Sequence, residues 1–81
     1  MARKHFARYE AISSAVPVED AFEPVIAIKR RGTDDKARIH AISTGKHYHF
    51  ASEADAIAEA ALTKVMEVSD TGELIFEPNA L

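Results

Sequence analysis

Residues 52–68 constrain the fold of this chain more than any other segment, because they carry the spacing of an amphipathic helix. Apolar side chains recur there at intervals of three and four residues, at Ala54, Ile57, Ala58, Ala61, Leu62, Val65 and Met66. Ser52 is the expected N-cap. Residues 69–72 are expected to end the helix, because Gly72 can adopt a positive φ. The acids expected to face solvent are Glu53, Asp55, Glu59 and Glu67. The segment predicts one helix that buries its apolar side.

The segments ahead of the helix have the composition of strands. The expected strands are residues 8–15, 22–30, 36–42 and 46–50, with residues 73–77 as a last short strand or an extended tail. Pro24 is expected at the start of its strand, because proline has no N–H to donate to a ladder. Glycine and polar residues between these segments predict tight turns.

Two of these turns set a register that can be compared with the hydrophobic pattern. A turn that pairs Arg31 with Lys36 places Ile28 opposite Ile39, and a second turn joins residues 36–42 to 46–50. Together the turns put the same six side chains on one face, which are Ile26, Ile28, Ile39, Ala41, Tyr48 and Phe50. A slip of one residue would send each of them to the opposite face, so the sequence predicts this face as the core.

The pattern predicts an α+β fold. We expect an antiparallel β-meander of three to four strands with one long amphipathic helix, about 52–68, packed on one face. The 81 residues leave room for a single domain, residues 1–81. Residues 1–7 and 78–81 are expected to be frayed.

The second face of the predicted sheet has no helix to cover it. Val25 and Ile42 are expected there as exposed cross-strand neighbours, and an exposed apolar patch can mark a contact. The leading hypothesis is therefore a protein-binding or regulatory module that binds a protein partner or a second copy. The residues assigned to this surface are Val25, Ala27, Ile42, His40, His47 and His49. Alternatively, Phe6, Leu74 or Phe76 folds over the same face.

Basic residues are concentrated ahead of the helix. Residues 29–50 hold six basic residues against two acids, whereas residues 51–81 hold one against seven. Nucleic-acid binding is thus an alternative hypothesis, and its candidate residues are Lys29, Arg30, Arg31, Lys36, Arg38 and Lys46. A pI near 5.7 and few aromatic side chains weigh against it. A solvated strand edge that discourages aggregation explains the same residues.

No motif specifies a reaction. His40, His47 and His49 could approach one another, but no carboxylate is clearly available beside them, so we expect no metal site. Cysteine is absent, which excludes disulfides and thiolate nucleophiles. We expect no catalytic residue, no cofactor and no enzyme activity. The N-terminus lacks the apolar run of a signal peptide and no stretch is long enough to span a bilayer, so a cytoplasmic protein is expected.

Residues 49–57, His-Phe-Ala-Ser-Glu-Ala-Asp-Ala-Ile, follow three extended segments. An aromatic residue, a Ser or Thr cap and an acidic, alanine-rich helix after a β-meander resemble a pattern of small uncharacterised proteins of proteobacteria. The resemblance covers roughly residues 22–68 and implies a β-β-β-α architecture in a bacterial protein. It implies no activity, so no functional residue is carried over.

Overall fold

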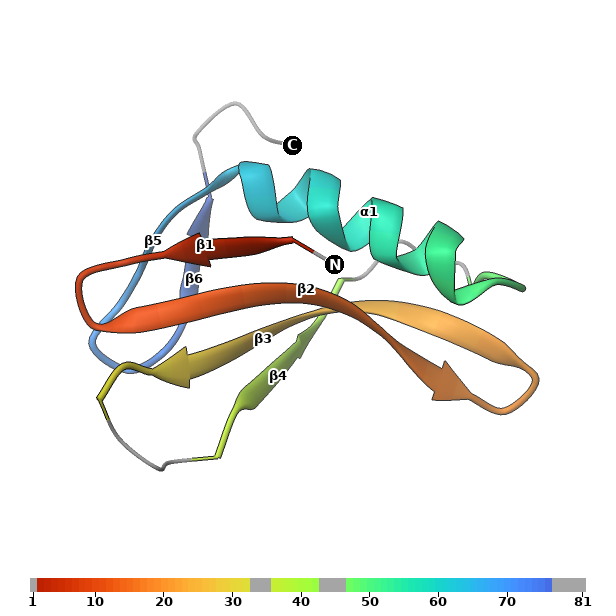
Figure 1. Ribbon diagram of the computed structural model, residues 1–81, viewed down its shortest axis with the longest axis horizontal. Coiled ribbons are helices and arrows are strands. Elements are labelled where there is room, and N and C mark those ends of the chain that lie inside the picture. The colour runs from red at the N-terminus through yellow and green to blue at the C-terminus, as the bar shows by residue number, and fades with distance from the viewer. Residues whose placement is uncertain (1, 33–35, 43–46, 77–81) are drawn as a thin grey trace.

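The computed structural model describes residues 2–32, 36–42 and 47–76. Its elements in chain order are β1 (Arg3–His5), β2 (Tyr9–Val18), β3 (Ala21–Arg30), β4 (Arg38–Ala41), α1 (Ala51–Thr63), β5 (Val65–Val68) and β6 (Leu74–Phe76). The first four strands form an antiparallel sheet in the order β1-β2-β3-β4, while β5 and β6 form a two-stranded sheet (Figure 1). The predicted α+β fold is confirmed, with a small second sheet in addition.

The hairpin of β2 and β3 is the centre of the larger sheet. Its strands pair along ten residues each and close at Val18 opposite Ala21. Because side chains alternate along both strands, every second side chain lies on one side of the sheet and the others lie on the opposite side. The side that α1 covers is called the helix face and includes Ala11, Ser13, Ile26 and Ile28. The opposite side is called the outer face and includes Ile12, Val25 and Ala27.

Residues 3–5 form the edge strand β1, so the prediction of a frayed segment 1–7 is wrong for them. Lys4 lies opposite Ala11 and its Nζ donates to the carbonyl of Val65 at 2.6 Å and to that of Thr63 at 3.4 Å. It places a positive charge at the C-terminal end of α1, whose last turn has no basic residue of its own. Residues 78–81 lie outside the described part of the chain.

The start of α1 differs from the prediction. Phe50 occupies the N-cap position without a side-chain capping bond, so the predicted cap at Ser52 is wrong. Asp55 faces the sheet and not solvent, because its Oδ1 accepts a hydrogen bond of 3.0 Å from the Ser13 hydroxyl. The Oγ of Ser13 in turn accepts the backbone N–H of Ala2 at 2.7 Å. A buried serine thus joins β2, α1 and Ala2, the residue just before β1.

The end of α1 also differs from the prediction. The helix stops at Thr63, and residues 65–68, which we predicted as its last turn, form β5. Valine at both ends of this strand favours an extended backbone, and pairing with β6 stabilises it. Gly72, with a φ of 83°, therefore serves the turn between β5 and β6 and not the end of the helix.

β4 pairs with β3 one residue out of the predicted register. Ile28 lies opposite Arg38, and Ala27 lies opposite Ile39. The shift moves Ile39 from the predicted core to the outer face, where 55% of its surface is exposed. Ala41 is exposed as well, so the predicted core was wrong for both residues.

In the described part of the predicted strand 46–50, which is residues 47–50, no residue pairs with β4. Tyr48 instead forms an isolated bridge with Phe22, with N–H to carbonyl distances of 2.9 and 2.7 Å in the two directions. The chain therefore continues along the same edge of β3 that β4 occupies. Phe50, predicted in the core, is 66% exposed.

Pro24 lies inside β3 and not at its start. Its carbonyl accepts the N–H of Ile42 at 2.9 Å, but it has no N–H to return to that residue. The ladder between β3 and β4 therefore weakens at this point, and β4 ends at Ala41.

The core lies between the helix face and the layer made by α1 and β5. Its buried cluster consists of Ala11, Ile26, Ile28, Leu62 and Val65. Ala54 and Ala58 have no exposed surface, because their small side chains let α1 approach the sheet closely.

Two isoleucines test this register. Ile26→Ala should lower the free energy of unfolding by about 2–5 kcal/mol, because it leaves a cavity in the core. Ile39→Ala should cost no more than about 1 kcal/mol, because that side chain already contacts water. Urea unfolding monitored by circular dichroism measures both. Equal losses would contradict the register, since both side chains would then be buried.

Candidate functional site

Apolar side chains line the outer face of the sheet. Val25, which we predicted as exposed there, is only 1% exposed. Ile42, predicted beside it, packs against the core on the helix side. The most exposed large apolar side chain on this face is Ile39, with exposed Ala41 and half-buried Ala27 beside it.

β4 is an edge strand with a free outer side in the described part of the chain. The bond from the N–H of Ile42 to the carbonyl of Pro24 fixes which residues face β3. Because hydrogen-bonded and non-hydrogen-bonded pairs alternate in an antiparallel ladder, Arg38 and His40 direct their backbone groups at β3. Ile39 and Ala41 direct theirs outward. The most exposed apolar residue of the outer face thus lies beside outward-facing N–H and C=O groups.

Carboxylate contacts flank the outer face. Near β1, Glu10 accepts contacts from Arg3 at 3.0 Å and from His5 at 3.4 Å. Near the turn of β2 and β3, Glu23 lies 3.5 Å from the imidazole of His47. These pairs leave the middle of the face, around Ala27, as its apolar part.

The three histidines of the predicted surface are dispersed. His40 lies on the helix side, where its Nε2 is 3.0 Å from the carbonyl of Gly72, so this nitrogen carries the proton of that hydrogen bond. His47 contacts Glu23, and His49 is exposed just before α1. Among the described residues, no group of three or more His, Cys, Asp or Glu side chains is placed to hold a metal ion.

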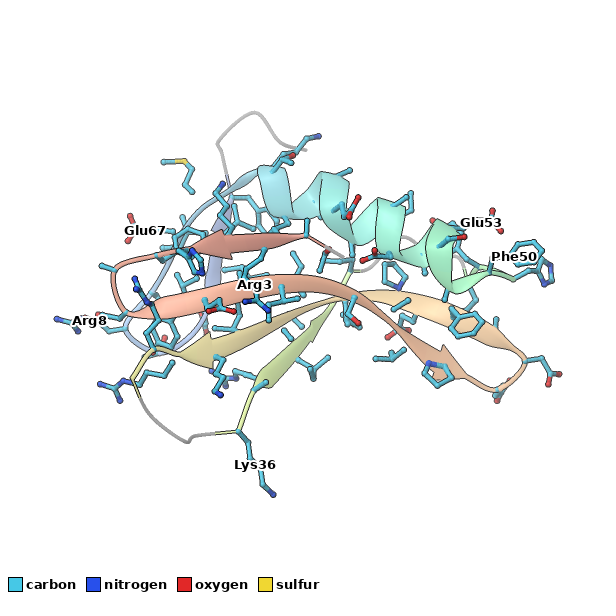
Figure 2. All side chains as sticks on the ribbon, in the orientation of Figure 1. Arg3, Arg8, Lys36, Phe50, Glu53 and Glu67 are labelled. Carbon is cyan, nitrogen blue, oxygen red and sulfur yellow. The ribbon has the colours of Figure 1, made fainter. Side chains whose placement is uncertain are left out.

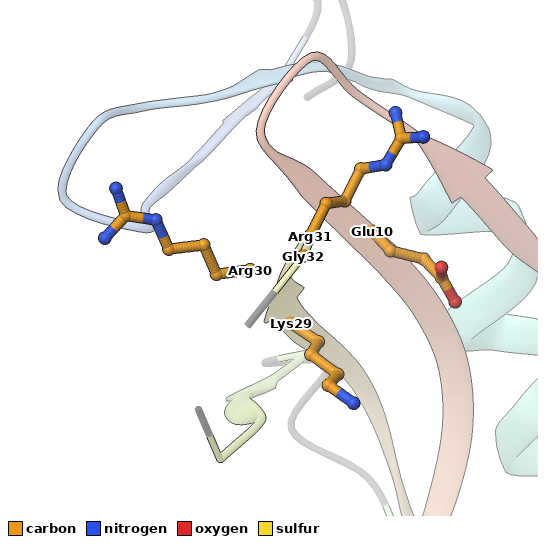
Figure 3. Close-up of a pocket in the computed structure, with 5 residues that line it drawn as sticks. All are labelled: Glu10, Lys29, Arg30, Arg31 and Gly32. Carbon is orange, nitrogen blue, oxygen red and sulfur yellow. The ribbon is translucent and has the colours of Figure 1, made fainter. Parts of the chain in front are cut away.

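Five of the six predicted basic residues gather at one end of the sheet, and Lys46 lies outside the described residues. Lys29 lies on the outer face opposite Glu10, whereas Arg30 points to the other side (Figure 3). A guanidinium N–H of Arg31 donates to the carbonyl of Phe6 at 3.1 Å. A hollow of about 240 Å³ lies among these side chains and Gly32.

A second hollow, of about 200 Å³, lies at the same end of the larger sheet but on its helix face. Its charged lining consists of three cations, Arg30, Lys36 and Arg38, and no acid lines it within the described residues. Lys36 extends away from the sheet into solvent (Figure 2). This hollow adjoins β4, because Arg38 belongs to that strand.

The turn between β5 and β6 closes one side of this second hollow. Three successive carbonyls of the turn face side chains of the larger sheet: Asp70 accepts from Tyr9, Thr71 from Arg38 and Gly72 from His40, at 3.0, 2.6 and 3.0 Å. The bond to Thr71 holds the side chain of Arg38 in place at the start of β4. Gly72 permits the approach, since a Cβ there would lie 3.2 Å from Nη1 of Arg38.

A second group of exposed apolar side chains lies on the smaller sheet. Met66 is 53% exposed, Ile75 is 40% exposed and Phe76 is 37% exposed. Met66 and Ile39 are thus nearly equal in exposure while belonging to different sheets. This pair offers a matched comparison of the two surfaces.

Sequence reasoning missed Ile39 and Ala41 as surface residues. Their alternation with polar neighbours fits either register of β4, so the pattern alone left their face undetermined. The choice between the two registers depends on contacts that the local pattern does not contain, such as the bond from Arg38 to the carbonyl of Thr71.

Comparison with protein-family models, with curated proteins and with solved structures finds no match for the chain. The resemblance to small β-β-β-α proteins stays a prediction. Among the described residues, no helix has the length and apolar content needed to cross a lipid bilayer.

Two glycines test the packing of Arg38 against the turn. Both have positive φ, 75° at Gly32 and 83° at Gly72, so alanine should cost about 1 kcal/mol of backbone strain at each. Gly72→Ala should cost more than Gly32→Ala, because only its Cβ meets a side chain. Thermal unfolding of the two variants measures the difference, and equal losses would contradict the close approach.

Proposed function

We propose that this chain is a small non-enzymatic module that binds another protein through the outer edge of β4 and the adjoining outer face. The observation that carries the proposal is Ile39, an isoleucine with 55% of its surface exposed on an edge strand. Proteins usually protect such edges, since unpaired N–H and C=O groups can pair with another chain. Partner binding would cover the side chain and satisfy these groups together.

Strand addition is the binding mode that suits this surface. An extended segment of a partner can pair with the outward-facing groups of Ile39 and Ala41 and continue the sheet. Main-chain hydrogen bonds then supply affinity, and the side chains on either face of the sheet supply specificity.

The non-enzymatic part of the proposal rests on the separation of the groups that could perform acid–base chemistry. His40 is bonded to the turn at Gly72, and His47 is paired with Glu23. Asp55 is bonded to Ser13 on the other side of the sheet from His47. These contacts spread the groups over the molecule and give each a structural partner.

Nucleic-acid binding is a second candidate. It is supported by the three cations that line the hollow beside β4, because phosphate groups are recognised by such clusters. Against it, the chain as a whole carries a formal net charge of −3, so its overall field does not attract a polyanion. Protein binding accounts for Ile39 as well as for the cations, so it is favoured.

Site-specific photo-crosslinking in the cells that express the protein tests the proposed function. A photoreactive amino acid replaces Ile39 in one variant and Met66 in the other, which match in exposure at 55% and 53%. We expect a discrete crosslinked protein adduct from position 39 and none from position 66. An adduct from position 66 alone would place the interface on the smaller sheet and refute the proposal.

A further inference from the structure

The two sides of the β4 edge differ in chemistry. On the outer face, Ile39 and Ala27 present apolar surface. On the helix side, Arg38 and Lys36 border the hollow of about 200 Å³, whose other charged lining residue is also a cation, Arg30. The side chains of a strand added to β4 would also alternate between the two faces of the sheet. Every second side chain would therefore meet the apolar surface of the outer face, and the side chains between them would meet the cations on the helix side.

A second copy of this chain is a poor occupant of the edge. Antiparallel pairing of two β4 strands about Ile39 would bring Arg38 of one copy diagonally across from Arg38 of the other. Like charges directly opposite or diagonal across strands are unfavourable. The charge of the edge therefore favours a partner strand that carries acids.

We infer that the occupant of the β4 edge is an extended protein segment in which acidic and apolar side chains alternate. This inference rests on the protein-binding function proposed above and names its partner class. The partner residue opposite Ile39 is apolar and lies on the outer face. The next partner residue is Asp or Glu, lies opposite His40 and directs its carboxylate toward Arg38 and Lys36.

The geometry around Arg38 favours this arrangement. Its Nη1 donates to the carbonyl of Thr71 at 2.6 Å, which holds the guanidinium beside the strand before any partner arrives. A guanidinium has five N–H donors, so this bond leaves others for a carboxylate. A preorganised cation loses less conformational entropy on binding than a free side chain.

An NMR titration with a synthetic peptide tests the inference. The probe is a short capped peptide of alternating Val and Glu, with two controls: the same peptide with Lys in place of Glu, and one with its residues rearranged into a Val block and a Glu block. At low salt the alternating Val-Glu peptide should shift the amide signals of Ile39 and Ala41. Hydrogen exchange at both amides of the unaltered protein should slow, because they become bonded to the peptide.

Proline substitution tests the backbone contacts. Ala41→Pro should abolish peptide binding while preserving the fold, because the N–H of Ala41 faces away from β3. His5→Pro is the matched control, since it removes an outward N–H from the other edge of the sheet and should leave binding unchanged. Lys36→Glu should weaken binding of the Glu peptide about fivefold.

Several outcomes would overturn the inference. If the Lys peptide bound as well as the Glu peptide, the partner strand would not need acidic residues. If the block peptide bound equally well, the acidic and apolar residues would not need to alternate. Shifts confined to Met66 and Ile75 would place strand addition on the smaller sheet. Concentration-dependent shifts at Ile39 without peptide would identify a second copy as the occupant, and stronger shifts with single-stranded RNA or duplex DNA would identify nucleic acid.

The crosslinking experiment separates this inference from the proposed function. If position 39 gave a protein adduct but the Glu peptide did not bind, the inference of an acidic partner strand would be wrong. The proposed protein-binding function would still be supported. No adduct and no peptide binding would refute both.

Discussion

The ladder between β2 and β3 determines where every other element of this protein can pack. Its pairing along ten residues of each strand directs Ala11, Ser13, Ile26 and Ile28 to one side. α1 can bury its alanines only against that side, since Ala54 and Ala58 need a surface close to the backbone of the helix. The opposite side carries Ile12, Val25 and Ala27, with carboxylate contacts at its margins, and it is the side to which we assign the proposed binding.

Polar contacts then connect the layers that the apolar core brings together. Ser13, buried in β2, bonds to Asp55 of α1 and accepts the N–H of Ala2, so it anchors both the helix and the residue that leads into β1. Lys4 reaches from β1 to the point where α1 passes into β5. Because Ser13 and Lys4 bond to partners in α1, in β5 and at Ala2, the relative position of these segments is set by hydrogen-bond geometry as well as by packing.

The sequence sufficed for the fold class, because the helical spacing of residues 54–62 and the apolar run around Ile26 are strong local patterns. It did not suffice for the register of β4, since alternating residues fit two pairings and the choice depends on contacts distant in sequence, such as Arg38 with the turn at Thr71. The helix end was missed for a similar reason: residues 65–68 continue the helical spacing, yet pairing with β6 makes them a strand. The surface at Ile39 followed from that register and was therefore missed with it.

Pro24 has a consequence for how long a bound strand can remain in place. By ending β4 at Ala41, it leaves an edge of four residues, of which two direct their backbone groups outward. Such an edge supplies few main-chain hydrogen bonds, each worth about 0.5–1.5 kcal/mol net. Stable cross-β stacking takes segments of about six residues or more, so this edge is too short to template it. A partner strand would therefore exchange rapidly, and the edge would stay open to reuse without recruiting further copies into a fibre.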